Sequence, residues 1–381
     1  MRKVFFAACV ALALFEFANV YFIMPMPGSQ RMRSLELAYA IYQSRWWVRG
    51  ALALVALAGL PTLAGATSRQ QRLALAGAVL TVGVAWVVNV TMSADHMFLV
   101  PQRLAMVTPD RNTLPLERLV VGVAINGEAR AYPLKFIGYH HQVPDTVGGQ
   151  PVLVSYCTVC RTGRVFSPLL DGRVETFRLV GMDHFNAMLE DRTTGSWWRQ
   201  ANGEAVAGPR LGQVMREVPS MQVTLRQWLS LYPDSRIMQA DSAALERYPK
   251  SDSMEIGASR SRLTGTDTAS WGDKSWVVGI AVGGASRAYD WNRLKRERVV
   301  LDTLGGVPLL LALGRDTASF AAFRRPSSEA RFAWRGDSLV DGDGRAYALH
   351  GRGPSGELPR VLASQEYWHS WRTFQPATTR W

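Results

Sequence analysis

The segment Asp145-Thr-Val-Gly-Gly-Gln-Pro-Val-Leu-Val-Ser-Tyr-Cys157-Thr-Val-Cys160-Arg-Thr-Gly163 contains the one closely spaced pair among the three cysteines. Most of its pattern recurs 157 residues later, without cysteines, as Asp302-Thr-Leu-Gly-Gly-Val-Pro-Leu-Leu-Leu-Ala-Leu-Gly314. Upstream, Val121–Tyr132 matches Val278–Tyr289 at the same offset. Two blocks repeated without a gap between them predict an internal duplication that keeps its chemistry in the first copy.

A third pair of matching blocks lies downstream of the first two. Trp228-x4-Pro233-x-Ser235 is echoed by Trp371-x4-Pro376-x-Thr378, now at an offset of 143 residues. The second copy has therefore lost about fourteen residues between the landmarks.

The chain has 381 residues and a formal net charge of +12. This length allows two or three domains with full cores. The basic residues are scattered and form no block with interleaved aromatics, so we expect no nucleic-acid partner. Diffuse positive charge beside an apolar segment fits the anionic surface of a membrane, and the lipid bilayer is the partner we predict. The sequence identifies no protein or small-molecule partner.

Three apolar runs, at about 4–24, 50–66 and 73–92, are long enough to cross a bilayer. They predict a segment of three transmembrane helices over residues 1–93. Glu16 and Asn89 are the polar groups of interest within it. Such groups form either helix–helix hydrogen bonds or a polar pathway, and we favour the hydrogen bonds.

The positive-inside rule does not decide the orientation, because four basic residues flank each side. The two sets are Arg2, Lys3, Arg69 and Arg72, and Arg31, Arg33, Arg45 and Arg49. A short basic N-terminus usually remains cytoplasmic, and three crossings then place the soluble region outside. We therefore predict a multi-pass membrane protein whose soluble region is extracytoplasmic.

The predicted fold class is an N-terminal three-helix transmembrane segment followed by a mainly β, α+β soluble region of two pseudo-symmetric repeats. Asn126-Gly127 suits a type I′ hairpin turn, and Gly283-Gly284 takes the same place in the second copy. A short helix over Thr224–Tyr232 ends before Pro233. The expected divisions are a connector at 94–117, a first repeat with the cysteine pair at 118–239, a linker at 240–275 and a second, degenerate repeat at 276–381.

Cys157 and Cys160 lie in a pattern that reads as strand, turn and strand. A thioredoxin-type pair would instead begin a helix, whose dipole lowers the thiol pKa. A strand–turn–strand arrangement points two sulfurs at one place, which suits either a soft metal ion or a short-range disulfide that is comparatively easy to reduce.

Candidate nitrogen ligands for this pair are His140 and His141, with His184 further along. The second copy has Glu297 and Arg298 at the positions of His140 and His141, and it lacks the cysteines. The joint loss is expected if the histidines and cysteines form one site. We therefore predict a metal site of Cys157, Cys160, His140, His141 and His184, with copper or zinc as the ion and no other cofactor.

Two other blocks receive structural interpretations. Asp145 and the two glycines after Val147 occur in both copies, so we interpret them as a turn rather than as catalytic groups. Trp197 and Trp198 cannot both face the same core, since successive strand residues alternate. We favour packing, or a place at a sheet edge, over a pocket for this pair.

Two classes of function remain open. In the first, the cysteine pair is a metal-binding or thiol-redox site, and whether it is enzymatic is undecided. In the second, the β region is a non-catalytic scaffold beside the membrane, and the cysteines form a structural disulfide. Ligand atoms must converge to within about 2.0–2.3 Å of one point, so the positions of the histidines discriminate between the two.

Five blocks in order resemble an uncharacterised family, the domain of unknown function three-one-seven-nine. They are Asp145-x-x-Gly-Gly-x-Pro-Val with Tyr156-Cys-x-x-Cys160, Asp191-Arg-x-Thr-x-Ser-x-Trp198-x-Gln200, Gly203-Glu-Ala-x-x-Gly208 and the terminal Tyr367-Trp-x-x-Trp371-x-x-Phe-x-Pro376-x-Thr378. The resemblance covers about residues 115–381. It implies an exported or membrane-anchored bacterial protein with His140 and both cysteines at family positions, and it implies no activity. Thr158 and Arg161 stand where that family usually has Pro and Gly.

Overall fold

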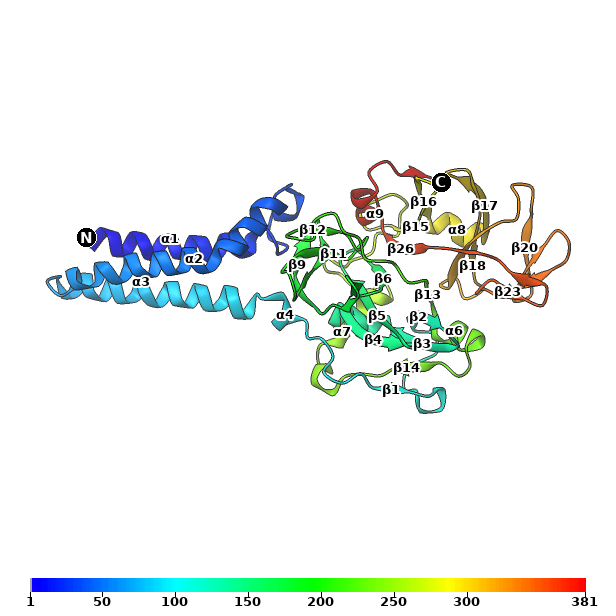
Figure 1. The fold of residues 1–381 in the computed structure, drawn as a ribbon, viewed down its shortest axis with the longest axis horizontal. Coiled ribbons are helices and arrows are strands. Elements are labelled where there is room, and N and C mark those ends of the chain that lie inside the picture. Colours follow the sequence, from blue (N-terminus) through cyan, green and yellow to red (C-terminus); the bar gives the residue numbers. More distant parts are fainter. Residues whose placement is uncertain (1) are drawn as a thin grey trace. The chain divides into compact units, whose positions relative to one another are not determined.

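The computed structural model describes residues 2–381, which form two compact units (Figure 1). The helical unit contains the residues up to Phe98 together with Phe177–Arg199 and Glu204–Gln213. The β unit contains Leu99–Thr176, Gln200–Gly203 and Val214–Trp381. The division interrupts the segment that we expected to be one first repeat, because residues 177–199 and 204–213 group with the helices.

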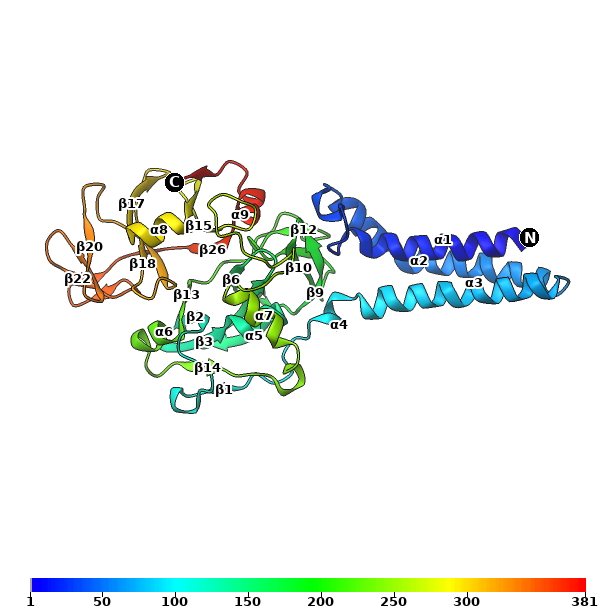
Figure 2. The ribbon, with the colours of Figure 1, turned by 180° about the vertical axis from the view of Figure 1, so that it is seen from behind.

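Three long helices run side by side in the helical unit, and both ribbon views show them (Figures 1 and 2). They are α1 (Arg2–Tyr21), α2 (Leu35–Gly59) and α3 (Ser68–Trp86). A π-helical turn, η3 (Val87–Thr91), extends α3, and the short α4 (Ala94–Met97) follows. Short 3-10 turns η1 (Ser29–Arg31) and η2 (Leu60–Leu63) lie in the connections between the long helices.

Lys3–Tyr21, Leu35–Leu63 and Ser68–Thr91 are each long and apolar enough to cross a membrane. Large apolar side chains remain more than half exposed on all three helices, among them Val10, Leu14, Leu54, Leu57, Leu75, Val79, Leu80 and Val82. Surfaces of this kind are suited to lipid rather than water, so the helices indicate membrane association. The second helix begins fifteen residues before the expected 50–66, because its first turns carry polar and aromatic residues that pack on a sheet instead of facing lipid.

This sheet has the strand order β12-β11-β10-β9 and is antiparallel throughout. Its strands are β9 (Phe177–Asp183), β10 (Asn186–Asp191), β11 (Trp197–Arg199) and β12 (Ala205–Ala207). Trp197 and Trp198 point to opposite faces and both are fully buried. The Trp197 ring packs edge-on against Tyr39, whereas Trp198 meets Phe177. Neither face of the sheet therefore exposes its tryptophan.

Two sheets of the β unit are built on hairpins with the same turn. The first has the order β1-β14-β3-β2-β13 and the second β26-β15-β16-β27. The first contains β1 (Met106–Val107), β2 (Leu119–Ile125), β3 (Glu128–Pro133), β13 (Ser220–Thr224) and β14 (Arg236–Met238). The second contains β15 (Trp276–Val282), β16 (Ala285–Asp290), β26 (Ala363–Tyr367) and β27 (Thr379–Arg380). Positive φ angles at Asn126, Gly127, Gly283 and Gly284 are those of the predicted type I′ turns.

Two further sheets have the orders β4-β5-β6 and β17-β18-β19-β25. Their strands are β4 (Gln142–Val147), β5 (Gln150–Cys157), β6 (Thr162–Phe166), β17 (Val299–Leu304), β18 (Val307–Leu313), β19 (Phe320–Arg324) and β25 (Arg360–Val361). Smaller ladders are formed by β7 (Leu169–Leu170) with β8 (Arg173–Val174), by β20 (Phe332–Arg335), β21 (Ser338–Asp341) and β22 (Ala346–Tyr347), and by β23 (Arg352–Gly353) with β24 (Gly356–Glu357).

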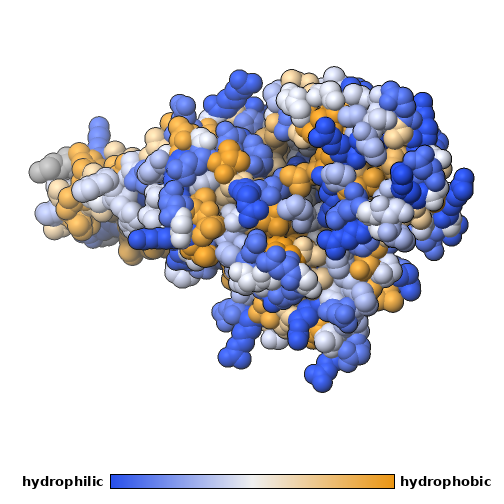
Figure 3. All heavy atoms as spheres, turned by 45° about the vertical axis from the view of Figure 1, so that its right-hand side comes forward, coloured by the Kyte–Doolittle hydropathy of each residue, from blue (hydrophilic) through white to orange (hydrophobic). Residues whose placement is uncertain are grey.

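Short helices connect these strands. They are α5 (Leu134–His140), α6 (Leu225–Leu231), α7 (Tyr248–Glu255), α8 (Trp291–Glu297) and α9 (Trp368–Phe374), with 3-10 turns η4 (Pro109–Arg111) and η5 (Ser242–Ala244). The β unit is thus a mixed α/β region with many small sheets. Hydrophilic residues cover much of the face drawn in Figure 3, with smaller hydrophobic patches between them. That face is therefore compatible with water.

Candidate functional site

The cysteine pair lies at the tip of the β5–β6 hairpin. Cys157 is the last residue of β5 and pairs with Thr162, the first residue of β6, so that Cys160 lies in the connecting turn. Both cysteines are fully buried, and no disulfide is formed within residues 2–381. The turn therefore holds both cysteines in a place from which water is excluded.

Arg161 fixes the conformation of this turn. Its φ angle of 57° is left-handed, and its side chain is fully buried. The guanidinium donates to the Met254 and Glu255 carbonyls, both at 3.0 Å, and lies 3.7 Å from the centroid of the Trp276 ring. Arg161 thus anchors the turn to the end of α7.

His141 follows α5 and lies beside the cysteine strand. Its backbone carbonyl accepts a hydrogen bond of 2.9 Å from the Tyr156 amide, one residue before Cys157. The imidazole is buried, with Nδ1 3.2 Å from the Tyr139 carbonyl. Burial lowers the pKa of His141 to about 4, so the ring is neutral at physiological pH, as a metal ligand or a proton acceptor must be.

His140 uses both ring nitrogens in other contacts. Nδ1 lies 2.5 Å from the Leu99 carbonyl and therefore carries the proton. Nε2 then accepts from the Tyr248 hydroxyl at 2.9 Å. Burial also lowers the pKa of His140. These bonds tie α5 to α7 and engage both nitrogens of a histidine that we predicted as a metal ligand.

His184 belongs to the helical unit, whereas the cysteines belong to the β unit. It follows β9 with a positive φ angle, and its Nδ1 lies 2.5 Å from Asp183 Oδ1. Asp183 also accepts from Arg199 at 2.7 Å. His184 thus joins a charge network centred on the buried Asp183, at the edge of the β9–β12 sheet.

Across residues 2–381, no group of three or more His, Cys, Asp and Glu side chains is arranged to hold a metal ion. The structure instead brings a different pair of residues to the cysteine turn. These are Lys274, which we had assigned to the linker, and His369 of α9.

The Lys274 ammonium group contacts the cysteine turn directly. Nζ donates to the Val159 carbonyl, between the two cysteines, at 2.7 Å, and to the Leu263 carbonyl at 2.5 Å. His369 Nε2 lies 3.2 Å from the same Nζ and 3.1 Å from the Val159 carbonyl. The Tyr367 amide donates to the Cys160 carbonyl at 2.8 Å, which joins the turn to β26.

Burial sets the protonation of this cluster. It lowers the pKa of Lys274 to about 8, although negative charge on Cys160 and Cys157 acts to raise it. Burial, together with the neighbouring Lys274 charge, lowers the pKa of His369 to about 4. Near neutral pH the cluster therefore contains one ammonium group, neutral imidazole and two cysteines, an arrangement that favours a thiolate.

Two signals in the sequence were available for these residues. Lysine accounts for only five of the 43 basic residues. Each lysine is therefore an exception in a chain whose basic residues are mostly arginine. An amine can lose its proton at accessible pH, whereas guanidinium cannot. His369 lies within the Tyr367–Trp371 block, and neither residue has a cysteine or histidine near it in sequence.

Taken together, the fold and the cluster define a membrane-associated protein whose mixed α/β region holds a buried dithiol beside an amine. Residues 101–378 match the family described as Protein of unknown function (DUF3179), and the chain belongs to this family. Comparison with curated proteins and with solved structures found no match.

Proposed function

We propose that the β unit carries a thiol-redox site in which Cys157 and Cys160 cycle between dithiol and disulfide. The observation that supports it is the half-buried Lys274 ammonium group, which donates a hydrogen bond to the carbonyl of Val159 inside the cysteine turn. A cation held there stabilises a thiolate, which is the reactive form of cysteine.

The reaction we propose is exchange with a small disulfide. The Cys160 thiolate attacks one sulfur of RSSR and releases RS⁻, which takes up a proton. The Cys157 thiolate then attacks the Cys160 sulfur of the mixed disulfide and displaces the second RS⁻. The net change is two cysteine thiols and one RSSR to one Cys157–Cys160 disulfide and two RSH. Burial of both sulfurs favours a small partner over a protein disulfide.

Replacing Lys274 by Met should slow oxidation of the pair by 2-hydroxyethyl disulfide about tenfold near pH 7, because the positive charge beside the thiolate is lost. The difference from wild type should disappear near about pH 9.5, where Lys274, with a pKa of about 8, is itself neutral. Quenched alkylation followed by mass spectrometry of the full chain in detergent measures the rate.

Lys250→Met is the matched control, since Lys250 is exposed on α7 and should react as wild type. Lys274→Arg should still accelerate oxidation of the cysteine pair at high pH, because the guanidinium group stays charged. Equal rates for wild type and Lys274→Met near pH 7 would refute the proposal. That result would favour the alternative of a non-catalytic membrane-anchored β-scaffold for partner binding, with the cysteines as a structural element.

Binding of copper or zinc is the second candidate function. Two sulfurs on one turn with neutral His141 beside the strand suit a soft ion, and Lys274 would balance the net charge of −1 on a Cu(I) dithiolate. The reduced chain would then retain about one equivalent of metal, and Cys157→Ser with Cys160→Ser would abolish this. Elemental analysis of the same preparations separates the two candidates.

We also propose three membrane crossings with a cytoplasmic N-terminus, which places the β unit outside the cytoplasm. The three long apolar helices and the basic Arg2-Lys3 start support this orientation. Alkaline phosphatase fused after Trp381 should be active, and a reporter active only in the cytoplasm should be silent. The reverse pattern would contradict the orientation.

Finally, we propose that the β unit arose by duplication. In the first half, Asp145 accepts from Arg130 at 2.5 Å and from Tyr132 at 2.6 Å. In the second, Asp302 accepts from Arg287 and Tyr289 at 2.5 and 2.7 Å. The indole N–H groups of Trp228 and Trp371 both donate, at 2.7 Å, to a hydroxyl seven residues later. Matching contacts at matching offsets support a common origin.

A further inference from the structure

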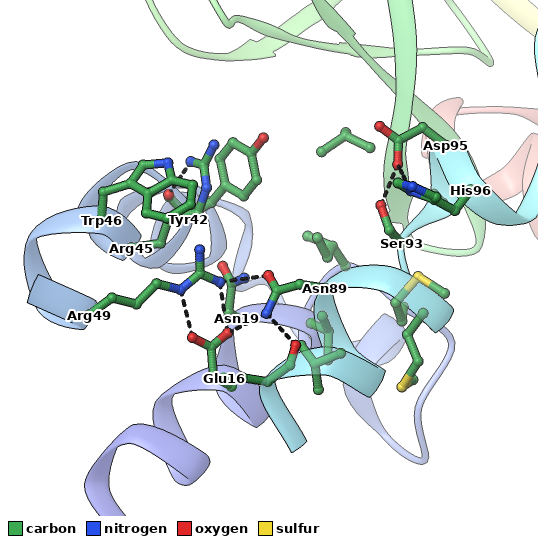
Figure 4. A pocket seen from close by; sticks show the side chains of 18 of the residues that line it. Glu16, Asn19, Tyr42, Arg45, Trp46, Arg49, Asn89, Ser93, Asp95 and His96 are labelled. Carbon is green, nitrogen blue, oxygen red and sulfur yellow. Dashed lines mark hydrogen bonds and ion pairs between the residues drawn. The ribbon is translucent and has the colours of Figure 1, made fainter. Parts of the chain in front are cut away.

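The helical unit contains a cavity of about 780 Å³ that neither the thiol site nor the proposed crossings explain. All of its lining residues belong to that unit, and they come from α1, α2, the end of α3, α4 and the first strands of the sheet. Figure 4 shows charged and polar side chains from three helices directed toward one another around it. The apolar remainder of the lining includes Leu12, Val20, Ala53 and Val88.

One end of the cavity is formed by a closed network of Glu16, Arg49 and Asn89. Arg49 donates to both Glu16 carboxylate oxygens, at 2.6 and 2.7 Å, and to Asn89 Oδ1 at 2.6 Å. Asn89 in turn donates to Glu16 at 2.8 Å. Asn89 lies in the π-helical turn η3, a distortion that recurs at functional sites. Glu16 and Arg49 therefore neutralise each other and leave no net charge at this end.

The opposite end carries one arginine and two carboxylates, a formal net charge of −1. Arg178 forms ion pairs with Glu190 at 2.8 Å and with Asp95 at 3.2 Å. Arg49 at one end of the cavity and Arg178 at the other are thus each paired with a carboxylate.

Two polar groups in the lining are not satisfied in this way. The Arg45 guanidinium lies 3.6 Å from the centroid of the Tyr42 ring and donates to the Tyr42 carbonyl, and it is paired with no carboxylate in residues 2–381. Asn19 is 6% exposed, and its Oδ1 has no hydrogen-bond partner within the same range. An orphaned buried acceptor is costly unless a bound molecule donates to it. An anionic group at Arg45 and a hydrogen-bond donor at Asn19 Oδ1 would satisfy both groups.

The surroundings indicate where in the membrane this cavity lies. Trp46 and Trp47 are 69% and 84% exposed on α2, beside Arg45 and Arg49. Beyond them α2 continues as the apolar run from Ala51 to Gly59. Exposed tryptophans with arginines at the end of an apolar run mark the head-group level of a bilayer.

We propose that this cavity binds one phospholipid whose head group carries a phosphate and a hydroxyl or amine donor. The phosphate pairs with Arg45, the donor bonds to Asn19 Oδ1, and the acyl chains follow the apolar lining toward the bilayer. This assignment rests on membrane association alone and is independent of the thiol site.

Titration of the delipidated full chain in non-ionic detergent tests the proposal, with dioctanoyl-phosphatidylglycerol as the probe and thermal unfolding as the readout. Wild type should bind about one equivalent, and more tightly than it binds dioctanoyl-phosphatidylcholine, whose head group has no donor. Arg45→Gln should weaken phosphatidylglycerol binding about tenfold, as loss of one charge-assisted hydrogen bond does. Asn19→Leu should remove the preference over phosphatidylcholine while leaving the fold intact.

Arg69→Gln is the matched control, since Arg69 is exposed on α3 far along the chain from the cavity and should not change binding. Inorganic phosphate alone should not stabilise the chain at the same concentration. Equal stabilisation by both lipids in wild type, unchanged binding in Arg45→Gln, or full stabilisation by inorganic phosphate would each overturn the assignment.

Discussion

Replacing Glu366 by Gln should lower the free energy of unfolding of the β unit by about 3–5 kcal/mol, because it removes one partner of a buried ion pair. Glu366 Oε1 accepts from Arg164 at 2.8 Å and from Ser364 at 2.7 Å, and Oε2 accepts from Ser370 at 2.8 Å. The Glu366 and Arg164 side chains are 2% and 10% exposed. Gln has the same shape but no charge, so Arg164 would retain only Glu217, at 3.1 Å.

This pair joins β6 of the first half to β26 of the second, so its loss should weaken the association of the halves. Urea unfolding of the full chain in detergent, followed by tryptophan fluorescence, measures the change. Glu357→Gln is the control, since its partner Arg352 is exposed and a surface pair contributes at most about 1 kcal/mol. A Glu366→Gln midpoint equal to that of the control would show that the pair contributes nothing net.

Gly279→Ala should destabilise the β unit by about 3 kcal/mol, because a Cβ at this position would lie closer than 3.0 Å to the six-membered ring of Trp371. The indole would have to move and would lose its hydrogen bond to Thr378. Gly122→Ala should cost a similar amount, since Trp228 covers Gly122 in the same way. Glycine within a strand here marks a close approach of a side chain.

Gly342→Ala is the control, because no atom lies within 4 Å of the Cβ it would add. Introducing Trp371→Leu into Gly279→Ala should recover part of the loss, which a double-mutant cycle quantifies. Gly279→Ala could have the same free energy of unfolding as the control while Gly122→Ala has a lower one. The Gly–Trp contacts of the two halves would then not be equivalent. That outcome would weaken the proposed duplication.

Local sequence patterns predicted the elements whose causes are local. Apolar length predicted three long helices, and Asn126-Gly127 predicted its turn, because bilayer-length hydrophobicity and positive φ depend on neighbouring residues only. The start of α2 at Leu35 was missed, since its first turns are stabilised by contacts with the distant strands β9–β12. The same contacts explain why Trp197 is buried.

Of the residues in the candidate site, only the cysteines could be predicted from the sequence. Cys157 and Cys160 are adjacent in sequence, so a short hairpin suffices to bring them together. His140, the nearest histidine of the family pattern, is engaged by Leu99 and Tyr248, and that pairing requires the packing of α5 on α7. No spacing rule indicates such a partner.

The sequence by itself therefore determined the membrane-length helices, the paired hairpins and the position of the thiols, because each follows from residues within one turn, strand or helix. Only the tertiary structure decided which charges meet. Lys274 and His369 reach the cysteine turn from 114 and 209 residues beyond Cys160. Arg49 meets Glu16 across two helices. Burial then sets the protonation of Lys274 and His369, and burial is a property of the packed chain rather than of any segment.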